Sequence, residues 1–200
     1  MANRVTPGIL EDKEIARLAK EEGMIEPFEE SLIREVDGRR VLSYGLSSMG
    51  YDIRADLEWY IASSAHVVKD SVLDPKDFKE VLMHKVVSQG GPVDLPAYSF
   101  ALTHSVERFK MPKDVIGIAV GKSTYARVGL IVNITPLEPG WEGWLTIEVI
   151  NPTPYPIRVY PIEGIAQIVF FRSAKKPMTN YEDRKGKYQG QEKRVVFAKV

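Results

Sequence analysis

The 200-residue chain contains no cysteine and only three histidines. The absence of cysteine excludes disulfide scaffolds, thiol nucleophiles and every cysteine-ligated zinc site. The histidines, His66, His84 and His104, stand far apart and match no metal-ligand spacing. We therefore expect each of them to be a solvated or packed side chain, and we expect no zinc.

An excess of either charge is also missing, since 27 basic residues balance 27 acidic ones. Proteins that coat nucleic acid or anionic membranes usually carry a basic excess, so neither partner is expected, although a local site for a small anion stays open. No apolar run approaches the ~20 residues of a membrane helix. The N-terminal stretch becomes acidic and helical where a signal peptide would be apolar. These features predict a cytoplasmic protein.

The first forty residues read as a helical part of a single domain that spans residues 1–200. Residues 11–22 place Ile15, Leu18 and Ala19 on one helical face, and Gly23 follows as a stop signal. A second short helix is expected over residues 28–34. The fold class predicted for the chain is nevertheless mainly β, because strand-like runs dominate the remaining sequence.

From residue 41 onward, short β-branched and aromatic runs alternate with glycine, proline and aspartate turns. The predicted strands are residues 52–54, 58–61, 98–102, 115–120, 130–134, 144–149, 157–159 and 165–171. Prolines crowd residues 152–161 and fit edges and turns, because each lacks a donor for a strand ladder. No long helical pattern separates the strands, which favours an antiparallel sandwich or barrel over a parallel sheet.

Two segments contain residues suited to chemistry. Residues 117–124 have glycines at both ends of a short run before Lys122, but three residues separate them where a P-loop needs four. Lys122, two hydroxyls and Arg127 suit a polyphosphate about as well as they suit a solvated turn. The second segment is residues 138–149. Its residues Leu145, Ile147 and Val149 alternate with Thr146 and Glu148, as in a strand with two different faces.

Glu148 has two interpretations. A strand glutamate usually points to solvent. Its apolar neighbours, however, could raise the pKa of its carboxyl, which would suit it to shuttle protons.

The last residues, 180–200, are polar, yet they include Tyr181, Tyr188 and an apolar run at 195–197. This composition predicts a segment that docks on the rest of the chain rather than a mobile tail.

Five segments in order, residues 48–54, 121–127, 138–148, 163–167 and 187–191, resemble the dCTP deaminase family. The resemblance implies a distorted antiparallel β-barrel or jelly roll of the dUTPase-like type, with N-terminal helices. It implies deamination of dCTP to dUTP and ammonia, and homotrimers with active sites at subunit interfaces. It also implies Mg²⁺ bound with the triphosphate, dTTP as a possible inhibitor, and a segment 180–200 that closes over the site.

The same resemblance assigns residue roles. Glu148 matches the catalytic glutamate; Arg127 would orient it, and Ser123 with a main-chain carbonyl near Pro136 would hold the attacking water. No protein side chain is expected to bind metal. The expected substrate contacts are Lys122, Ser123, Thr124, Tyr125, Ala126, Arg127, Pro136, Thr146, Ile147, Glu148, Gln167, Tyr181, Lys187 and Gln191.

Two positions depart from the family pattern. Many relatives have Arg at the position of Lys122, and many have Asp at that of Glu138, where bifunctional deaminase–dUTPases use an aspartate. A monofunctional deaminase is therefore favoured; a bifunctional enzyme and a non-catalytic nucleotide-binding regulator are the alternatives. Asp52 and Arg54 are assigned to an internal ion pair rather than to catalysis.

Overall fold

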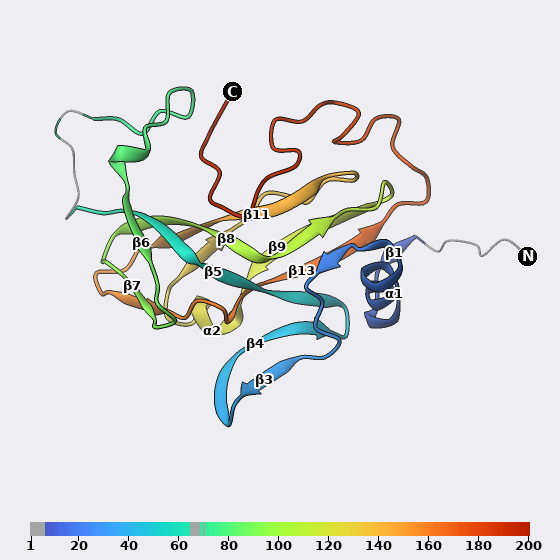
Figure 1. Cartoon of the computed structure of the whole chain (residues 1–200), viewed down its shortest axis with the longest axis horizontal. Coiled ribbons are helices and arrows are strands. Elements are labelled where there is room, and N and C mark those ends of the chain that lie inside the picture. Colours follow the sequence, from blue (N-terminus) through green and yellow to red (C-terminus); the bar gives the residue numbers. More distant parts are fainter. Residues whose placement is uncertain (1–6, 65–68, 70) are drawn as a thin grey trace, which may run out of the picture.

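A strongly curled antiparallel sheet dominates the computed structural model, which describes residues 7–64, 69 and 71–200 (Figure 1). His66 lies outside these residues. The strands of the large sheet run in the order β1-β13-β5-β8-β11-β10; β2 pairs with β8, β3 with β4, β4 and β6 with β5, and β9 with β13. A second, two-stranded sheet pairs β12 with β7.

The elements have the following bounds: β1 (Gly8–Ile9), α1 (Asp12–Glu22), β2 (Ile25–Glu26), β3 (Ile33–Val36), β4 (Arg39–Ser47), β5 (Gly50–Ala62), η1 (Glu80–Leu82), β6 (His84–Val87), β7 (Val93–Leu95), β8 (Ser99–Lys110), β9 (Val115–Gly121), α2 (Ser123–Ala126), β10 (Ile131–Asn133), β11 (Glu142–Asn151), β12 (Ile157–Val159) and β13 (Gly164–Arg172).

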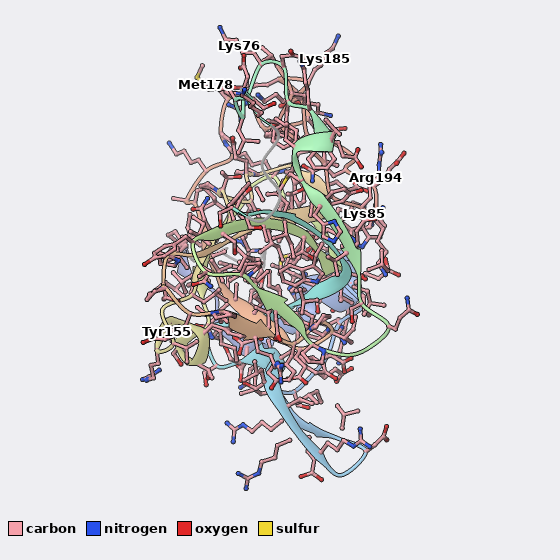
Figure 2. All side chains as sticks on the ribbon, turned by 90° about the vertical axis from the view of Figure 1, so that its left-hand side faces the viewer. Lys76, Lys85, Tyr155, Met178, Lys185 and Arg194 are labelled. Atoms are coloured by element: carbon pink, nitrogen blue, oxygen red, sulfur yellow. The ribbon has the colours of Figure 1, made fainter. Side chains whose placement is uncertain are left out.

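Each strand expected from the sequence coincides with an observed strand, because alternating or continuous apolar residues line the inner face of the sheet. The expected strands at 52–54 and 58–61 are the two ends of the single strand β5. The prolines of residues 152–161 all lie outside strands, as predicted. The short strands β1, β2, β6 and β7 were not predicted. The more polar strands β3 and β4 were not predicted either, and their hairpin extends away from the sheet (Figures 1 and 2).

The first helix is confirmed, with Ile15, Leu18 and Ala19 buried and Gly23 closing it in a left-handed conformation at φ 70°. The second expected helix, at 28–34, is wrong. The backbone there bonds outward to the sheet: the Glu29 N–H donates to the Tyr51 hydroxyl at 3.1 Å, and the Glu29 carbonyl accepts the Leu46 N–H at 3.1 Å. These long-range bonds replace the local ones that a helix needs.

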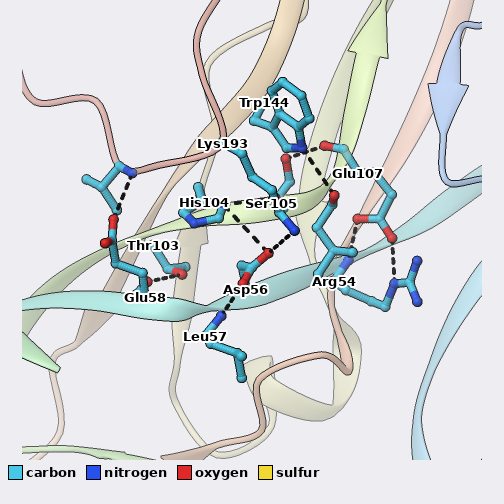
Figure 3. Close-up of polar contacts among 12 residues, drawn as sticks. Arg54, Asp56, Leu57, Glu58, Thr103, His104, Ser105, Glu107, Trp144 and Lys193 are labelled. Carbon is cyan, nitrogen blue, oxygen red and sulfur yellow. Dashed lines mark hydrogen bonds and ion pairs between the residues drawn. The ribbon is translucent and has the colours of Figure 1, made fainter. Parts of the chain in front are cut away.

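Two charged residues of β5 lie in buried ion pairs, although not with each other as the sequence had suggested. Arg54 Nε donates to Glu107 Oε1 at 2.7 Å, and the Arg54 N–H donates to Oε2 of the same carboxylate at 3.0 Å (Figure 3). Asp52 instead pairs with Lys122, which follows β9. Neighbouring side chains on a strand point to opposite faces and next-but-one side chains lie apart, so partners on other segments are reached more easily.

Replacing Glu107 by Gln is expected to lower the free energy of unfolding by about 3–5 kcal/mol, because the buried Arg54 guanidinium then keeps only the more distant Glu29 carboxylate, 3.8 Å away. Urea unfolding followed by tryptophan fluorescence measures the change. The matched control is Asp94→Asn, which removes one partner of the exposed Asp94–Arg158 pair and should leave the midpoint unchanged. Equal midpoints for the two variants would contradict this role of Glu107.

Candidate active site

A pocket of about 540 Å³ lies between the outward face of β11, the loop that follows β10, and the C-terminal segment. It gathers six of the residues that the resemblance assigned to the substrate. They are Pro136, Thr146, Glu148, Tyr181, Lys187 and Gln191. Apolar side chains, among them Leu102, Ile134 and Trp141, form much of the remaining wall. The pocket therefore combines a carboxylate with a largely apolar lining.

Glu148 enters this pocket because β11 alternates. Leu145, Ile147 and Val149 are buried in the core, so Thr146 and Glu148 face the other way. Burial raises the pKa of the Glu148 carboxyl above its ordinary value, and the hydrogen bond from Asn133 opposes part of that shift. The direction agrees with the proton-shuttle interpretation of this residue. A carboxyl with a raised pKa exchanges a proton more readily near neutral pH.

Asn133 is the contact that sequence reasoning missed. It lies on β10 directly opposite Glu148 in the register of the β10–β11 pair. Its Nδ2 donates to Glu148 Oε2 at 3.0 Å. Its sequence surroundings give no signal of this contact, because only the strand register relates Asn133 to a carboxylate fifteen positions later.

The C-terminal segment docks on β11, as its composition predicted. Gln191 Nε2 donates to the Trp144 carbonyl at 2.9 Å and to Thr146 Oγ1 at 3.2 Å. The chain crosses β11 at Gly143, where φ is 146° and a Cβ would lie 2.7 Å from the Gln191 nitrogen. A glycine is thus required at this crossing.

Tyr181 and Lys187 enter the pocket from the turn that precedes Gln191. The Tyr181 N–H donates to the Pro139 carbonyl at 2.9 Å, and the Tyr181 hydroxyl accepts the Tyr188 N–H at 3.1 Å. Glu138 also lines the pocket and forms an ion pair with Arg184. The turn is therefore held to the loop before β11 by both backbone bonds and charge.

The loop at residues 122–127 is not among the residues that line the pocket. Lys122 is mostly buried and donates to Asp52, so it is not the solvated lysine of a simple turn. Arg127 is exposed and its Nη1 donates to the Ser123 carbonyl at 2.9 Å. Ser123, Thr124 and Ala126 lie on the same short helix, and the first two add their hydroxyls to this surface. The loop thus presents two hydroxyls and a guanidinium to the outside of the chain.

Three other expected substrate contacts are buried or bonded to other parts of the chain and lie outside the pocket lining. Tyr125 is buried, and its hydroxyl accepts the Tyr160 N–H at 2.9 Å. Ile147 is fully buried in the core, which leaves only its backbone for a ligand in the pocket. Gln167 lies on β13 and donates to Ser47 Oγ at 3.1 Å. None of the three lines the pocket.

The described residues contain no group of three or more His, Asp or Glu side chains arranged to hold a metal ion. His104 is buried, with Nδ1 3.0 Å from the Ser105 carbonyl, and is thus a packed side chain. Across residues 7–64, 69 and 71–200, no helix is long and apolar enough to span a membrane.

The curled antiparallel sheet and its carboxylate-bearing pocket define a mainly β protein with a small-molecule site. The chain belongs to the dCTP deaminase-like family, whose sequence model it matches over residues 9–173. It is 49% identical over 183 residues to a dCTP deaminase of Acidovorax sp. (strain JS42). It is 50% identical over 183 residues to one of Paracidovorax citrulli (strain AAC00-1). Each match covers 92% of this chain and 95% of the relative.

The fold agrees with this membership. The crystal structure of 2′-deoxycytidine 5′-triphosphate deaminase from Agrobacterium tumefaciens superposes with a TM-score of 0.60 over 84% of this chain, at 20% identity. The chain spans about half of that longer protein, 49% of its length. The predicted fold class and the family resemblance are both confirmed.

Replacing Asn133 by Ala is expected to raise the pKa of Glu148 further, because the carboxylate loses a donor that stabilises its charged form. Asn133→Asp should raise it more, since a second carboxylate would then face the first. A ¹³C NMR titration of the labelled glutamate carboxyls measures both midpoints. An unchanged midpoint in Asn133→Ala would show that Asn133 does not act on Glu148.

Proposed function

We propose that this chain is an enzyme that deaminates dCTP to dUTP and ammonia, with Glu148 as its general base and acid. The observation that carries the proposal is a glutamate of raised pKa inside a pocket whose wall the docked C-terminal segment completes. The two bacterial relatives, about half identical over nearly the whole chain, support the same substrate. The dUTP produced would feed the synthesis of dUMP, and the cytoplasm is the expected location.

In the proposed reaction, Glu148 takes a proton from a water molecule, whose oxygen attacks C4 of the cytosine ring. The protonated Glu148 then delivers this proton to N3. In the collapse of the tetrahedral intermediate, the second proton of the water goes to the amino group, which leaves as ammonia. General acid–base catalysis of this kind contributes roughly 10²–10⁴-fold. Asn133 holds one carboxylate oxygen during these transfers, so the other stays available for the water.

The pyrimidine ring would occupy the apolar part of the pocket, where Thr146 and Gln191 supply polar contacts. We assign Tyr181 and Lys187, which also line the pocket, to contacts with the triphosphate. The lining offers two carboxylates, Glu138 and Glu148, and each already has a partner in Arg184 or Asn133. A Mg²⁺ ion would accordingly bind through triphosphate oxygens and water rather than through protein side chains.

The exposed loop at 122–127 suggests that the site is completed by a neighbouring subunit. Exposed apolar side chains surround this loop on β9, β10 and the turn between them: Ile118, Val120, Val128 and Ile131. Such a surface is typical of a subunit interface. In a homotrimer, Ser123 and Arg127 of one subunit would reach the Glu148 pocket of the next, with Ser123 and the Pro136 carbonyl holding the water. Lys122 and Gln167 would act from the same interface.

A bifunctional enzyme that also releases pyrophosphate is the second candidate, because Glu138 lies in the pocket lining. Its ion pair with Arg184 favours a structural role. A dTTP molecule would bind the same pocket and compete with dCTP.

Incubation with dCTP and Mg²⁺, followed by separation of the nucleotides, distinguishes the candidate functions. Accumulated dUTP supports the monofunctional enzyme, dUMP with pyrophosphate supports the bifunctional one, and unchanged dCTP supports a regulator.

Glu148→Gln is expected to abolish turnover and to leave dCTP binding nearly unchanged, because the amide keeps the shape of the carboxylate but cannot accept and return the proton. Ammonia release measures turnover and calorimetry measures binding. Substantial turnover in this variant would contradict the assignment.

Mixing two inactive variants tests whether the site is shared. Glu148→Gln and Arg127→Ala should each be inactive alone. After joint refolding in equal amounts, about a quarter of the sites of a cyclic trimer would combine an intact Glu148 with an intact Arg127 from the neighbour. Ammonia release near that fraction of the unmodified activity is expected. A mixture as inactive as its parts would show that both residues act within one subunit, and sedimentation as a monomer would exclude the trimer.

A further inference from the structure

We propose that residues 192–198, which we name the C-terminal clamp, position Gln191 and one wall of the pocket by anchoring on β5 and on a small apolar cluster. The clamp comes after the last segment that carries the family resemblance. Its kinetic role rests on the proposed function, whereas its docking does not. Figure 1 shows the end of the chain passing over β11.

The first anchor is apolar. Val195 is 4% exposed and packs with Tyr60, Met83 and Leu102 in a cluster separate from the main core. Phe197 closes this cluster, with its ring edge-on to Tyr60 at 4.8 Å and stacked on Phe78 at 5.0 Å. Aromatic pairs in these geometries contribute about 0.5–1.5 kcal/mol beyond their buried area. The end of the chain is thus held by specific packing.

The second anchor is polar and lies on β5. Lys193 Nζ is 3.1 Å from Oδ2 of the mostly buried Asp56, and His104 Nδ1 lies 3.9 Å from the same oxygen (Figure 3). Two residues further along β5, Glu58 Oε1 accepts the Val195 N–H at 3.2 Å. Alternate residues of one strand therefore hold alternate residues of the clamp.

The clamp reaches the pocket through Val196. The Val196 N–H donates to Thr146 Oγ1 at 3.2 Å, and Thr146 is two residues from Glu148 on the same face of β11. Val196 and Ala198 line the pocket, together with Phe78 and Leu102 of the apolar cluster. Release of either anchor would therefore open one wall of the pocket and free the Thr146 hydroxyl that Gln191 also contacts.

Lys193, Val195 and Phe197 are accordingly positioning residues that act through Thr146 and Gln191 rather than by contact with the reacting atoms. If a variant keeps the clamp closed for about one tenth of the time, its apparent affinity for dCTP falls about tenfold. The chemical step in the closed complex stays unchanged, so the effect appears in KM and not in kcat.

Hydrogen exchange of the protein without nucleotide tests the docking. Phe197→Ala and Lys193→Met should each release the clamp and so accelerate exchange in a peptide covering residues 191–200. Release separates the Val195 and Val196 amides from their acceptors on Glu58 and Thr146. The matched control is Arg194→Ala. This side chain is two-thirds exposed, pairs with Glu192 and projects outward in Figure 2. Fast exchange of these amides in the unmodified protein, or equal exchange in all variants, would overturn the clamp.

Steady-state kinetics test the positioning role. Phe197→Ala should raise KM for dCTP about tenfold with kcat within about twofold, Phe197→Leu should recover much of the loss, and Arg194→Ala should match the unmodified protein. An unchanged KM, or a loss in kcat alone, would overturn the role. Absence of deamination in the unmodified protein would refute the proposed function and leave the exchange experiment as the test of docking.

Discussion

The two-faced register of β11 is the constraint on which the site depends. Leu145, Ile147 and Val149 fill the core, and this fixes Thr146 and Glu148 on the pocket side. The strand is held between β8 and β10, so a slip of one residue would expose three apolar side chains and bury the carboxylate. Hydrophobic burial therefore sets the direction in which the Glu148 carboxylate points.

Two ion pairs below the surface are the second structural feature that connects distant segments. Arg54 with Glu107 and Lys122 with Asp52 place four charged groups below the surface, each paired with an opposite charge on another segment. The Lys122–Asp52 pair also ties the start of the exposed loop at 122–127 to β5. Beyond this anchor, Ser123 and Arg127 lie exposed at the surface of the chain.

Most of the longer apolar strands and the first helix were predictable because local periodicity reports burial directly. The polar hairpin of β3 and β4 was not, since its pairing rests on backbone bonds that composition does not reveal. The helix expected at 28–34 failed for a related reason: bonds from Glu29 to Tyr51 and Leu46 join residues far apart in the sequence. Asp52 and Arg54 were rightly taken as ion-paired, but their partners come from other segments.

By itself, the sequence determined the class of chemistry and the family: the absence of cysteine excluded a cysteine-ligated zinc site, and five ordered motifs marked Glu148 and its neighbours. Only the tertiary structure decided which of those residues meet. It brought Gln191 onto Thr146 and Asn133 onto Glu148, left Ser123 and Arg127 outside the pocket, and joined Lys193 to Asp56. The physical reason is that motifs record residue types, whereas strand register and the docking of the chain end set distances between them.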